Sequence, residues 1–196
     1  MVNIRRVQHL STGLACEMEV DGQVHELHLR QGISMAHARA VAAALARALE
    51  LNTDIQHALS DAARFIPEEG QLNSRIGYRG ARILDGSYDM TADDMVEALA
   101  ALKQIPGRRK IALLGGCSDA ALGKKAGQCA HITILVGGDT EPAREAALAH
   151  GSDVHQLPTS KEAGQWLAEY LQTGDLVLVA GPKEYHLNEA VAELIP

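Results

Sequence analysis

The run of residues that comes nearest to a phosphate-binding loop is Ser118 to Lys125, with the sequence SDAALGKK. A Walker A loop needs a leading glycine, so that backbone N–H groups can wrap the phosphates, and a Ser or Thr after its lysine to hold magnesium. In this chain Ser118 stands in place of the glycine and Lys125 in place of the hydroxyl residue. The run therefore does not predict a phosphate-binding loop, and no GxGxxG motif follows a predicted strand.

Glycines cluster where predicted strands end, at Gly115-Gly116, Gly137-Gly138 and Gly181. Open parallel sheets bind their ligands at that edge, so a small-ligand site is one interpretation of the pattern. Glycines also make the tight turns that lead from a strand into a helix. The sequence leaves both interpretations open.

The remaining reactive residues give weaker signals. His25 and His28 are three residues apart on a predicted strand, so they face opposite sides and do not predict a shared metal ion. Cys117 and Cys129 flank a short predicted helix and are either small core residues or, with a lowered pKa, nucleophiles. The pair Asp93-Asp94 opens a predicted helix, where acidic residues favour the helix dipole, and a catalytic acid pair is the alternative.

Composition excludes several classes of function. The 196 residues are 46% hydrophobic and 22% charged, as in ordinary globular proteins. A formal net charge of -7 and an aromatic content of 3% predict no nucleic-acid partner, which would need basic surface and stacking rings. No apolar run approaches the ~20 residues that cross a bilayer, so we expect no membrane insertion. The first residues do not read as a signal peptide, and three cysteines without a CxxC pair fit a reducing compartment, so we expect a cytoplasmic location.

The first third of the chain predicts a small sheet followed by helices. Asp21-Gly22 is a strong hairpin signal between two alternating segments. The Ala- and Leu-rich segment 35–51 predicts a helix with Ser34 as its N-cap, and a shorter helix is expected over 54–64. Residues 65–75, with the sequence FIPEEGQLNSR, predict a linker because of their Pro and Gly. The expected strands are 2–10, 13–20 and 23–29.

Beyond the linker, apolar strands alternate with amphipathic helices. This alternation predicts right-handed βαβ units and therefore an α/β fold with a doubly wound, mostly parallel sheet. We place the boundary between the two parts at residues 68/69. The expected strands are 81–85, 110–115, 132–137, 153–157 and 175–181, and the expected helices are 92–105, 119–129, 141–151, 160–174 and 185–195.

The order of these segments, together with several short motifs, resembles the back half of the Mur ligases, and most closely the MurF type that adds D-alanyl-D-alanine. These are ATP-dependent, amide-forming enzymes of peptidoglycan precursor synthesis. The resemblance implies that residues 1–68 are the remnant of a central domain and that 69–196 form a Rossmann-like C-terminal domain. The motifs are GISMAHARAVAAALA from Gly32, FIPEEGQL, DGSYDMTADDM at 85–95, PGRRKIALLGG and GDLVLVAGPKEYHLNEAVAEL.

The resemblance also locates the family's nucleotide-site positions, and most of them are substituted in this chain. Where the family has His, Asn and Asn at a helix entrance, this sequence has Ser34, Met35 and Ala38. Gln71 stands where an arginine would reach ATP, and Gly86 replaces an aspartate. The candidate cleft residues implied by the resemblance are Ser34, Met35, Ala38, Gln71, Asp85, Gly86, Ser87, Tyr88, Asp89, Thr91, Gly115, Gly116 and Lys183.

Two hypotheses follow from the resemblance. The family's P-loop core has no counterpart in this sequence, so we expect no catalytic residue, no metal site and no cofactor for the chain alone. The first hypothesis is a catalytically degenerate, oligomeric binding or assembly module, in which a second copy or a partner protein covers residues 1–66. The second is a fragment or subunit of a UDP-MurNAc-tripeptide–D-alanyl-D-alanine-type amide ligase, completed by a P-loop-bearing chain that brings ATP and Mg. A small-ligand binder at the glycine-rich strand ends is a third, weaker possibility.

Overall fold

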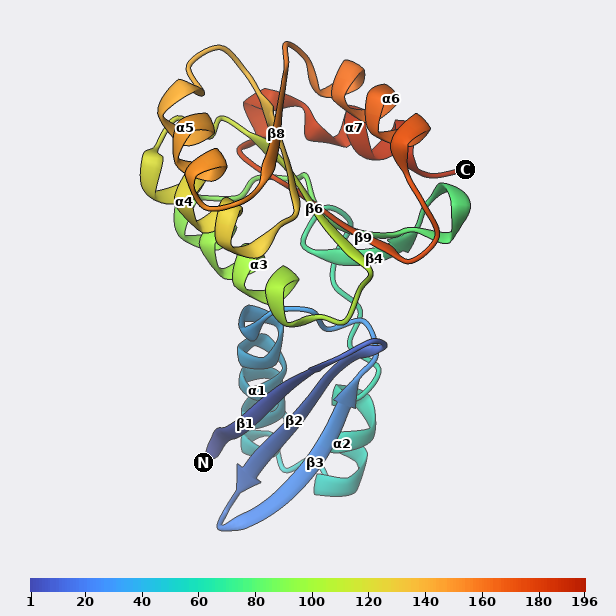
Figure 1. Cartoon of the computed structure of the whole chain (residues 1–196). Helices are drawn as coiled ribbons and strands as arrows, with labels where there is room; N and C mark the ends of the chain where they lie inside the picture. The colour runs from blue at the N-terminus through green and yellow to red at the C-terminus, as the bar shows by residue number, and fades with distance from the viewer. The chain divides into compact units, whose positions relative to one another are not determined.

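The computed structural model describes residues 1–196 and divides them into two compact units, Met1–Pro67 and Glu68–Pro196 (Figure 1). Each unit has a hydrophobic core of its own. The first core lies between a small sheet and two helices, and the second surrounds the strands of a larger sheet.

The first unit is built on an antiparallel sheet of β1 (Val2–Leu10), β2 (Gly13–Val20) and β3 (Gln23–Leu29), in the order β1-β2-β3. Asp21 and Gly22 join β2 to β3 with φ values of 48° and 85°. Two positive φ angles are what a type I′ hairpin turn requires, so the hairpin predicted from this Asp-Gly pair is confirmed. Side chains of β2 alternate in burial, because successive residues of a strand point to opposite faces of the sheet.

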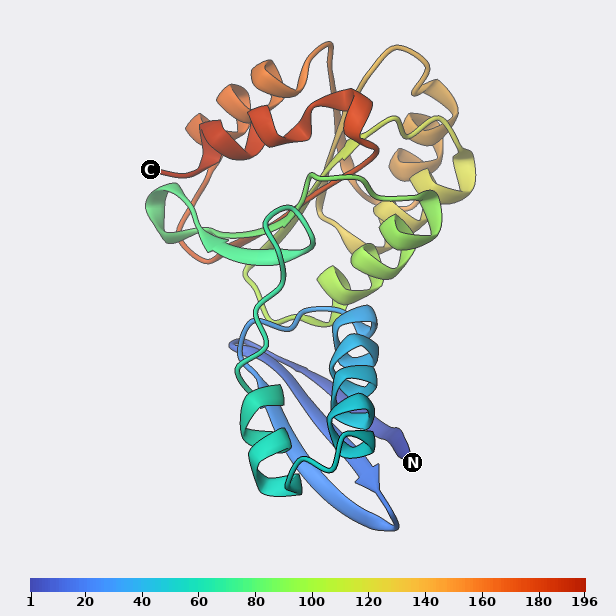
Figure 2. The ribbon, with the colours of Figure 1, turned by 180° about the vertical axis from the view of Figure 1, so that it is seen from behind.

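Helices α1 (Met35–Glu50) and α2 (Ile55–Ala62) cover one face of this sheet (Figure 2). The predicted N-cap of α1 is confirmed, because the Ser34 hydroxyl accepts a hydrogen bond from the His37 backbone N–H at 3.4 Å. The carboxylate of Asp54 caps α2 in the same way, at 3.0 Å from the Gln56 nitrogen. Apolar side chains of α1, such as Val41 and Leu45, complete the core of the unit.

The second unit has a six-stranded sheet in the order β4-β5-β9-β6-β7-β8. Five strands are parallel, which confirms the predicted α/β class with a mostly parallel sheet. The first strand is antiparallel and begins inside the stretch 65–75 that we expected to be a linker, so that expectation is wrong for residues 73–75. The segment NSRI has one apolar residue, so its own sequence pattern does not predict a strand. It is a strand because it pairs with β5. The strands are β4 (Asn73–Ile76), β5 (Arg82–Gly86), β6 (Arg109–Gly115), β7 (Ile132–Val136), β8 (Asp153–Leu157) and β9 (Asp175–Ala180).

The helices of this unit cover both faces of the sheet (Figures 1 and 2). The chain moves from β5 through β6 and β7 to β8, and then returns to insert β9 between β5 and β6. Crossover connections are right-handed, so connections that run in opposite directions along the sheet lie on opposite faces of it. The chain therefore leaves the end of β5 toward one face of the sheet and the end of β9 toward the other. This is a topological switch point, where open sheets form ligand crevices. One face carries α3 (Ala92–Gln104), α4 (Ala120–Cys129) and α5 (Glu141–Ala149), and the other carries α6 (Ser160–Tyr170) and α7 (Leu187–Leu194).

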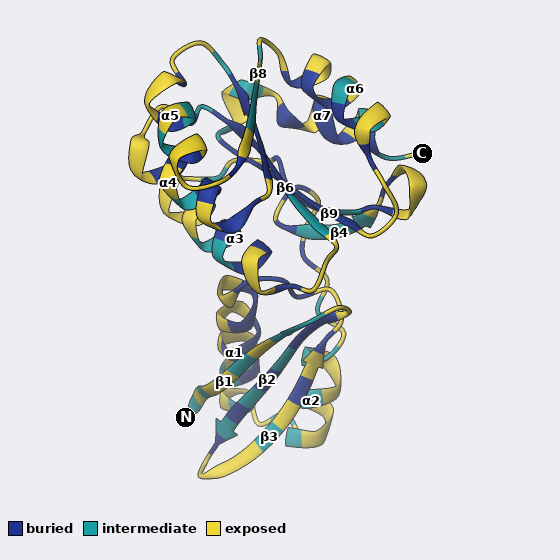
Figure 3. Cartoon of the chain, viewed as in Figure 1, coloured by how far each residue is buried: buried dark blue, intermediate teal, exposed yellow.

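The core of the second unit is densely packed. Every residue of β9 and of β7 is buried, and Figure 3 shows β9 in the colour of buried residues. Helices α4 and α5 approach closely because Gly123 has no side chain: a Cβ atom there would lie 2.2 Å from the Ala143 carbonyl oxygen. None of the helices is both long enough and apolar enough to cross a membrane.

Candidate functional site

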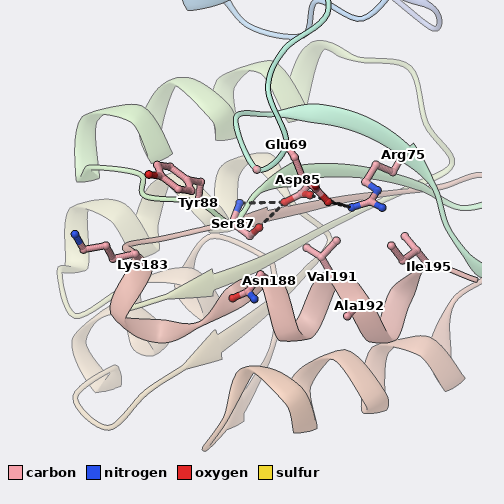
Figure 4. A pocket seen from close by; sticks show the side chains of 11 residues that line it. Glu69, Arg75, Asp85, Ser87, Tyr88, Lys183, Asn188, Val191, Ala192 and Ile195 are labelled. Carbon is pink, nitrogen blue, oxygen red and sulfur yellow. Dashed lines mark hydrogen bonds and ion pairs between the residues drawn. The ribbon is translucent and has the colours of Figure 1, made fainter.

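A pocket of about 540 Å³ lies in the second unit at the carboxyl ends of β5 and β9 (Figure 4). Its walls come from the segment before β4, from β4 itself, from the turns after β5 and β9, and from α7. The lining residues are Glu69, Gly70, Arg75, Asp85, Ser87, Tyr88, Lys183, Asn188, Val191, Ala192 and Ile195.

The centre of the pocket is a buried carboxylate, Asp85, of which 1% is exposed. Its Oδ1 accepts hydrogen bonds from the Ser87 hydroxyl at 2.6 Å and from the Ser87 backbone N–H at 3.2 Å. Its Oδ2 lies 3.7 Å from the Arg75 guanidinium, which also contacts Glu69 at 2.8 Å. Figure 4 shows Asp85 between Ser87 and Arg75, with contacts drawn to both. A buried charge needs such partners, and here all of them come from the protein.

The two ends of the pocket differ in character. Figure 4 shows Tyr88 and Lys183 at one end and Arg75 and Ile195 at the other. Tyr88 is 66% exposed, and the Lys183 ammonium group has no acidic partner within the protein. Helix α7 contributes an apolar wall through Val191 and its neighbours. A free cation, an exposed ring and an apolar wall together suit a small ligand with one negative group.

Backbone hydrogen bonds hold the loops around the pocket. The Tyr88 N–H donates to the Gly70 carbonyl at 3.2 Å, and the Met90 N–H donates to the Gly181 carbonyl at 3.0 Å. The Lys183 N–H donates to the Asp89 carboxylate at 3.4 Å. Gly70 has a φ of 77°, and a Cβ atom there would lie 2.8 Å from the Cβ of Tyr88, so this close approach requires glycine. The turns after β5 and β9 are thus tied together.

Gly115 and Gly116 lie outside this pocket. The ring of Tyr185 covers them, because a Cβ atom on Gly115 would lie 2.8 Å from Tyr185 and one on Gly116 would lie 2.4 Å from it. A Cβ atom on Gly137, just after β7, would lie 2.7 Å from the same ring. A side chain of this protein therefore fills the space beside Gly115, Gly116 and Gly137, whereas a Cβ atom on Gly138 would meet nothing within 4 Å.

Four of the candidate residues are not among the residues that line the pocket. Ser34, Met35 and Ala38 belong to the first unit, where Ser34 caps α1, Ala38 is buried in the core and Met35 is 37% exposed. The Gln71 side chain is exposed and donates a hydrogen bond to Glu68 at 3.1 Å. None of these four lines the pocket.

Three candidate residues lie just beside the pocket. Gly86 is buried, and a Cβ atom there would lie 2.6 Å from the Met90 sulfur. Thr91 is the N-cap of α3 and forms a capping box with Asp94, so the second residue of the acidic pair closes the helix end. Asp89 is exposed, and its carboxylate accepts the Lys183 N–H described above.

The structure thus gathers Asp85, Ser87, Tyr88 and Lys183 from the predicted set into one pocket. Sequence reasoning missed Glu69, Gly70, Arg75 and the residues in and just after α7. Nothing in the local pattern of the α7 residues marks them as neighbours of β5. The signal that could have revealed Arg75 is its place as a basic residue close after the acidic pair in FIPEEGQLNSR, which favours an ion pair.

The cysteines are core residues. Burial raises the pKa of the Cys16 thiol to about 11 and that of Cys117 to about 12. Cys129 is also buried, and its pKa is raised by the same loss of solvent. Thiols of this kind are poor nucleophiles. No group of three or more His, Cys, Asp or Glu side chains among residues 1–196 is arranged to hold a metal ion.

Comparison with known proteins gives the family. The family model described as "Mur ligase, glutamate ligase domain" matches residues 73–182. The MurF ligase from Thermotoga maritima in complex with ADP is 15% identical, with a TM-score of 0.79, and covers 98% of this chain and 45% of its own. MurF from Acinetobacter baumannii is 20% identical, with a TM-score of 0.80 and the same coverage. Folylpolyglutamate synthase from Mycobacterium tuberculosis, complexed with ADP and AMPPCP, is 12% identical, with a TM-score of 0.70. The match covers 98% of this chain and 48% of that protein.

No curated protein matches the chain. At these identities the solved structures establish the fold, and the chain spans less than half the length of the ligases it resembles. The resemblance to the Mur ligases expected from the motifs is confirmed. Because the family model matches more than half of the sequence, this chain belongs to the Mur ligase family.

Proposed function

We propose that this chain is a binding or assembly module of the Mur ligase family that does not carry out ATP-dependent ligation by itself. The observation that carries the proposal is that each carboxylate at the pocket already forms a hydrogen bond or an ion pair within the protein. Glu69 is paired with Arg75, Asp85 with Ser87 and Arg75, and the Asp89 carboxylate with the Lys183 N–H. To bind magnesium or to accept a proton, each of these carboxylates would have to give up or share a contact that it makes within the protein.

Two local features add support. The position at which the resemblance places a second aspartate is Gly86, and the space a side chain would need there is taken by Met90. The glycines after β6, which could have offered backbone N–H groups to a phosphate, lie under the Tyr185 ring. The residues of this unit therefore do not fit a complete site for ATP and Mg.

Calorimetric titration with ATP and Mg tests the proposal. We expect no binding tighter than about 1 mM, which corresponds to about -4 kcal/mol. The Lys183→Ala variant should change the result little, and Lys161→Ala, on the exposed surface of α6, is its matched control. Binding in the micromolar range that Lys183→Ala weakens and Lys161→Ala does not would contradict the proposal.

The assembly part of the proposal concerns the first unit. The sheet of this unit has two edge strands, β1 and β3, and exposed edges favour pairing with further chains. We therefore propose that residues 1–66 form an interface with a second copy or with a partner protein. Sedimentation of the purified chain, and of the chain captured with its neighbours from its own cells, tests this. A monomer that captures nothing, with residues 1–66 resistant to proteases, would contradict it.

A second candidate function is a subunit or fragment of an active amide ligase, completed by a chain that carries the P-loop. The gathering of Asp85, Ser87, Tyr88 and Lys183 in one pocket favours this alternative, as does the chain's coverage of less than half of the solved ligases. If the neighbouring reading frame encodes such a chain, the mixture should release ADP in the presence of a UDP-MurNAc-tripeptide and D-alanyl-D-alanine. Absence of ADP release from the mixture would exclude this alternative.

A further inference from the structure

The first unit contains a groove of about 490 Å³ between strand β3 and helix α2. Five consecutive residues of β3 line it, and consecutive side chains of a strand point to opposite faces. The groove therefore runs along the open edge of β3 rather than over one face. The α2 residues recur at helical spacing, so a single stripe of α2 forms the opposite wall. The lining residues are Val24, His25, Glu26, Leu27, His28, Gln56, Leu59, Ser60 and Ala63.

The backbone of β3 has unused hydrogen-bonding groups on this edge. β3 pairs with β2 on one side and has no strand on the other. The two-residue turn makes Val20 and Gln23 a hydrogen-bonded pair, and such pairs alternate along an antiparallel ladder. The N–H and C=O groups of Val24, Glu26 and His28 therefore point away from β2. This arrangement, an open strand edge beside a helix, is the geometry used to bind an extended peptide by strand addition.

The charges on the outer face of the sheet specify what kind of strand would fit. Across the three strands, Arg6 is opposite Glu17, and Glu17 is opposite Glu26. Arg6 and Glu17 form an ion pair at 3.7 Å, whereas no basic side chain contacts Glu26. Two like charges directly opposite each other destabilise a sheet. A Lys or Arg on a fourth strand, opposite Glu26, would complete the row with alternating charge.

The face of the groove toward α2 favours apolar side chains. Leu59 of α2 and Ala63 just after it, with Leu27 of β3, provide apolar walls. Val24 lies on the outer face with Glu26 and is 59% exposed, and Figure 3 shows β3 with long exposed stretches. The Nε2 atom of His25 is buried and has no hydrogen-bond partner, which destabilises the unit when nothing is bound. An added strand would cover Val24 and bring backbone and side-chain groups close to His25.

We propose that this groove receives an extended segment of a partner protein as a fourth strand, with Lys or Arg opposite Glu26 and apolar residues facing α2. The inference rests on the proposed role of residues 1–66 as an interface and names the edge and the chemistry of the partner. A second copy is the poorer occupant through its own β3, because that strand carries the same Glu26 and lies beside the same α2 helix.

The experiment uses the full chain and a fluorescein-labelled six-residue peptide that alternates Val and Thr, with Lys at one Thr position. Fluorescence anisotropy should detect saturable binding. Replacing the peptide Lys by Glu should weaken binding about tenfold, and N-methylation of alternate peptide amides should abolish it. In the Glu26→Lys variant the preference should invert in favour of the Glu peptide. Glu145→Lys, on an exposed position of α5, is the matched charge control and should change nothing.

Backbone amide shifts in NMR spectra give the independent readout. Shifts on adding the Lys peptide should concentrate at Val24, Glu26 and His28, and circular dichroism should show that both variants remain folded. The proposal is overturned by any of three outcomes: no saturable binding up to about 1 mM, equal binding of the Lys and N-methylated peptides, or shifts located elsewhere. Self-association of the chain that Glu26→Lys abolishes would also overturn it, in favour of a second copy. None of these outcomes affects the ATP titration, and a partner captured without peptide binding would leave the interface proposal in place.

Discussion

Two buried aspartates of the second unit are neutralised in different ways, and the difference separates a pocket from a structural anchor. Asp175, at the start of β9, receives two hydrogen bonds from Arg109, at 2.8 and 2.5 Å, and one from the Gln172 N–H at 2.8 Å. Its hydrogen bond to Arg109 raises the pKa of that guanidinium. Asp85 at the pocket has a looser contact with Arg75, at 3.7 Å, and Arg75 is shared with Glu69. The pocket pair can therefore rearrange at lower cost than the anchor.

The variant Asp175→Asn should lower the free energy of unfolding by about 3 kcal/mol, because it removes the buried carboxylate that pairs with the partly buried Arg109. Urea denaturation measures the change. The control is Asp153→Asn, which removes an exposed contact with His155 at 3.3 Å and should cost less than about 0.5 kcal/mol. Equal effects of the two substitutions would contradict the assignment of Asp175 as an anchor.

The buried thiols give a prediction about pH. At pH 8 a thiol with a pKa of about 11, as in Cys16, is deprotonated in about one molecule in a thousand. Alkylation of Cys16 and Cys117 should therefore be at least about 100-fold slower in the native protein than in urea, and alkylation of Cys129 should be slowed as well. Because the unfolded thiols lose their protons near pH 8.5 and the folded ones do not, stability should fall as pH rises above that value. Rapid native labelling, followed by mass spectrometry, would contradict this.

At the scale of elements, the helices and the hairpin were predictable because their signals are local. Thr91 and Asp94 form a cap within one turn, and Asp21-Gly22 satisfies the φ angles of its own turn. Strand β4 was not predictable, because its four residues pair with β5 through backbone groups that any sequence has. The close contact of α4 with α5 also lies beyond local patterns, because Gly123 is explained only by Ala143 on another helix.

This contact gives a test in which helix propensity and packing oppose each other. Replacing a helical Gly by Ala normally stabilises a helix by up to about 1 kcal/mol. At Gly123 the added methyl would lie 2.2 Å from a backbone oxygen of Ala143, so we expect Gly123→Ala to destabilise the protein by about 1–3 kcal/mol. Gly138→Ala is the control, because a Cβ there meets nothing within 4 Å. Thermal unfolding of both variants measures the difference, and a more stable Gly123→Ala would disprove tight packing.

At the scale of the whole molecule, the alternation of strands and helices in the sequence was enough to predict the fold class. The residues of the pocket could be predicted only in part. Asp85, Ser87 and Tyr88 are consecutive or nearly so, and motif resemblance placed them together with Lys183. Arg75 and Asn188 join them only because β4 pairs with β5 and α7 packs beside it. Long-range neighbours of this kind depend on strand order, which a single sequence does not specify.

The two separate cores predict that residues 68–196 fold without the first unit. Expressed alone, this segment should unfold in a single cooperative transition, because its core contains no residue from Met1–Pro67. Circular dichroism and fluorescence of its one tryptophan, Trp166, should report the same midpoint. Separate transitions, or a segment that precipitates at native pH, would show that the first unit is needed.

The position of β9 has a consequence for the synthesis of the chain. β9 is synthesised last among the strands and yet lies between β5 and β6. The two halves of the sheet therefore cannot be joined until this strand leaves the ribosome. The first unit, whose contacts lie close together in sequence, can form earlier during translation. Until β9 is synthesised, β5 and β6 have unpaired edges, to which a strand of another molecule could bind. A slow translation rate upstream of residue 175 would therefore lengthen the period of exposure, and this protein should depend on chaperones at that stage.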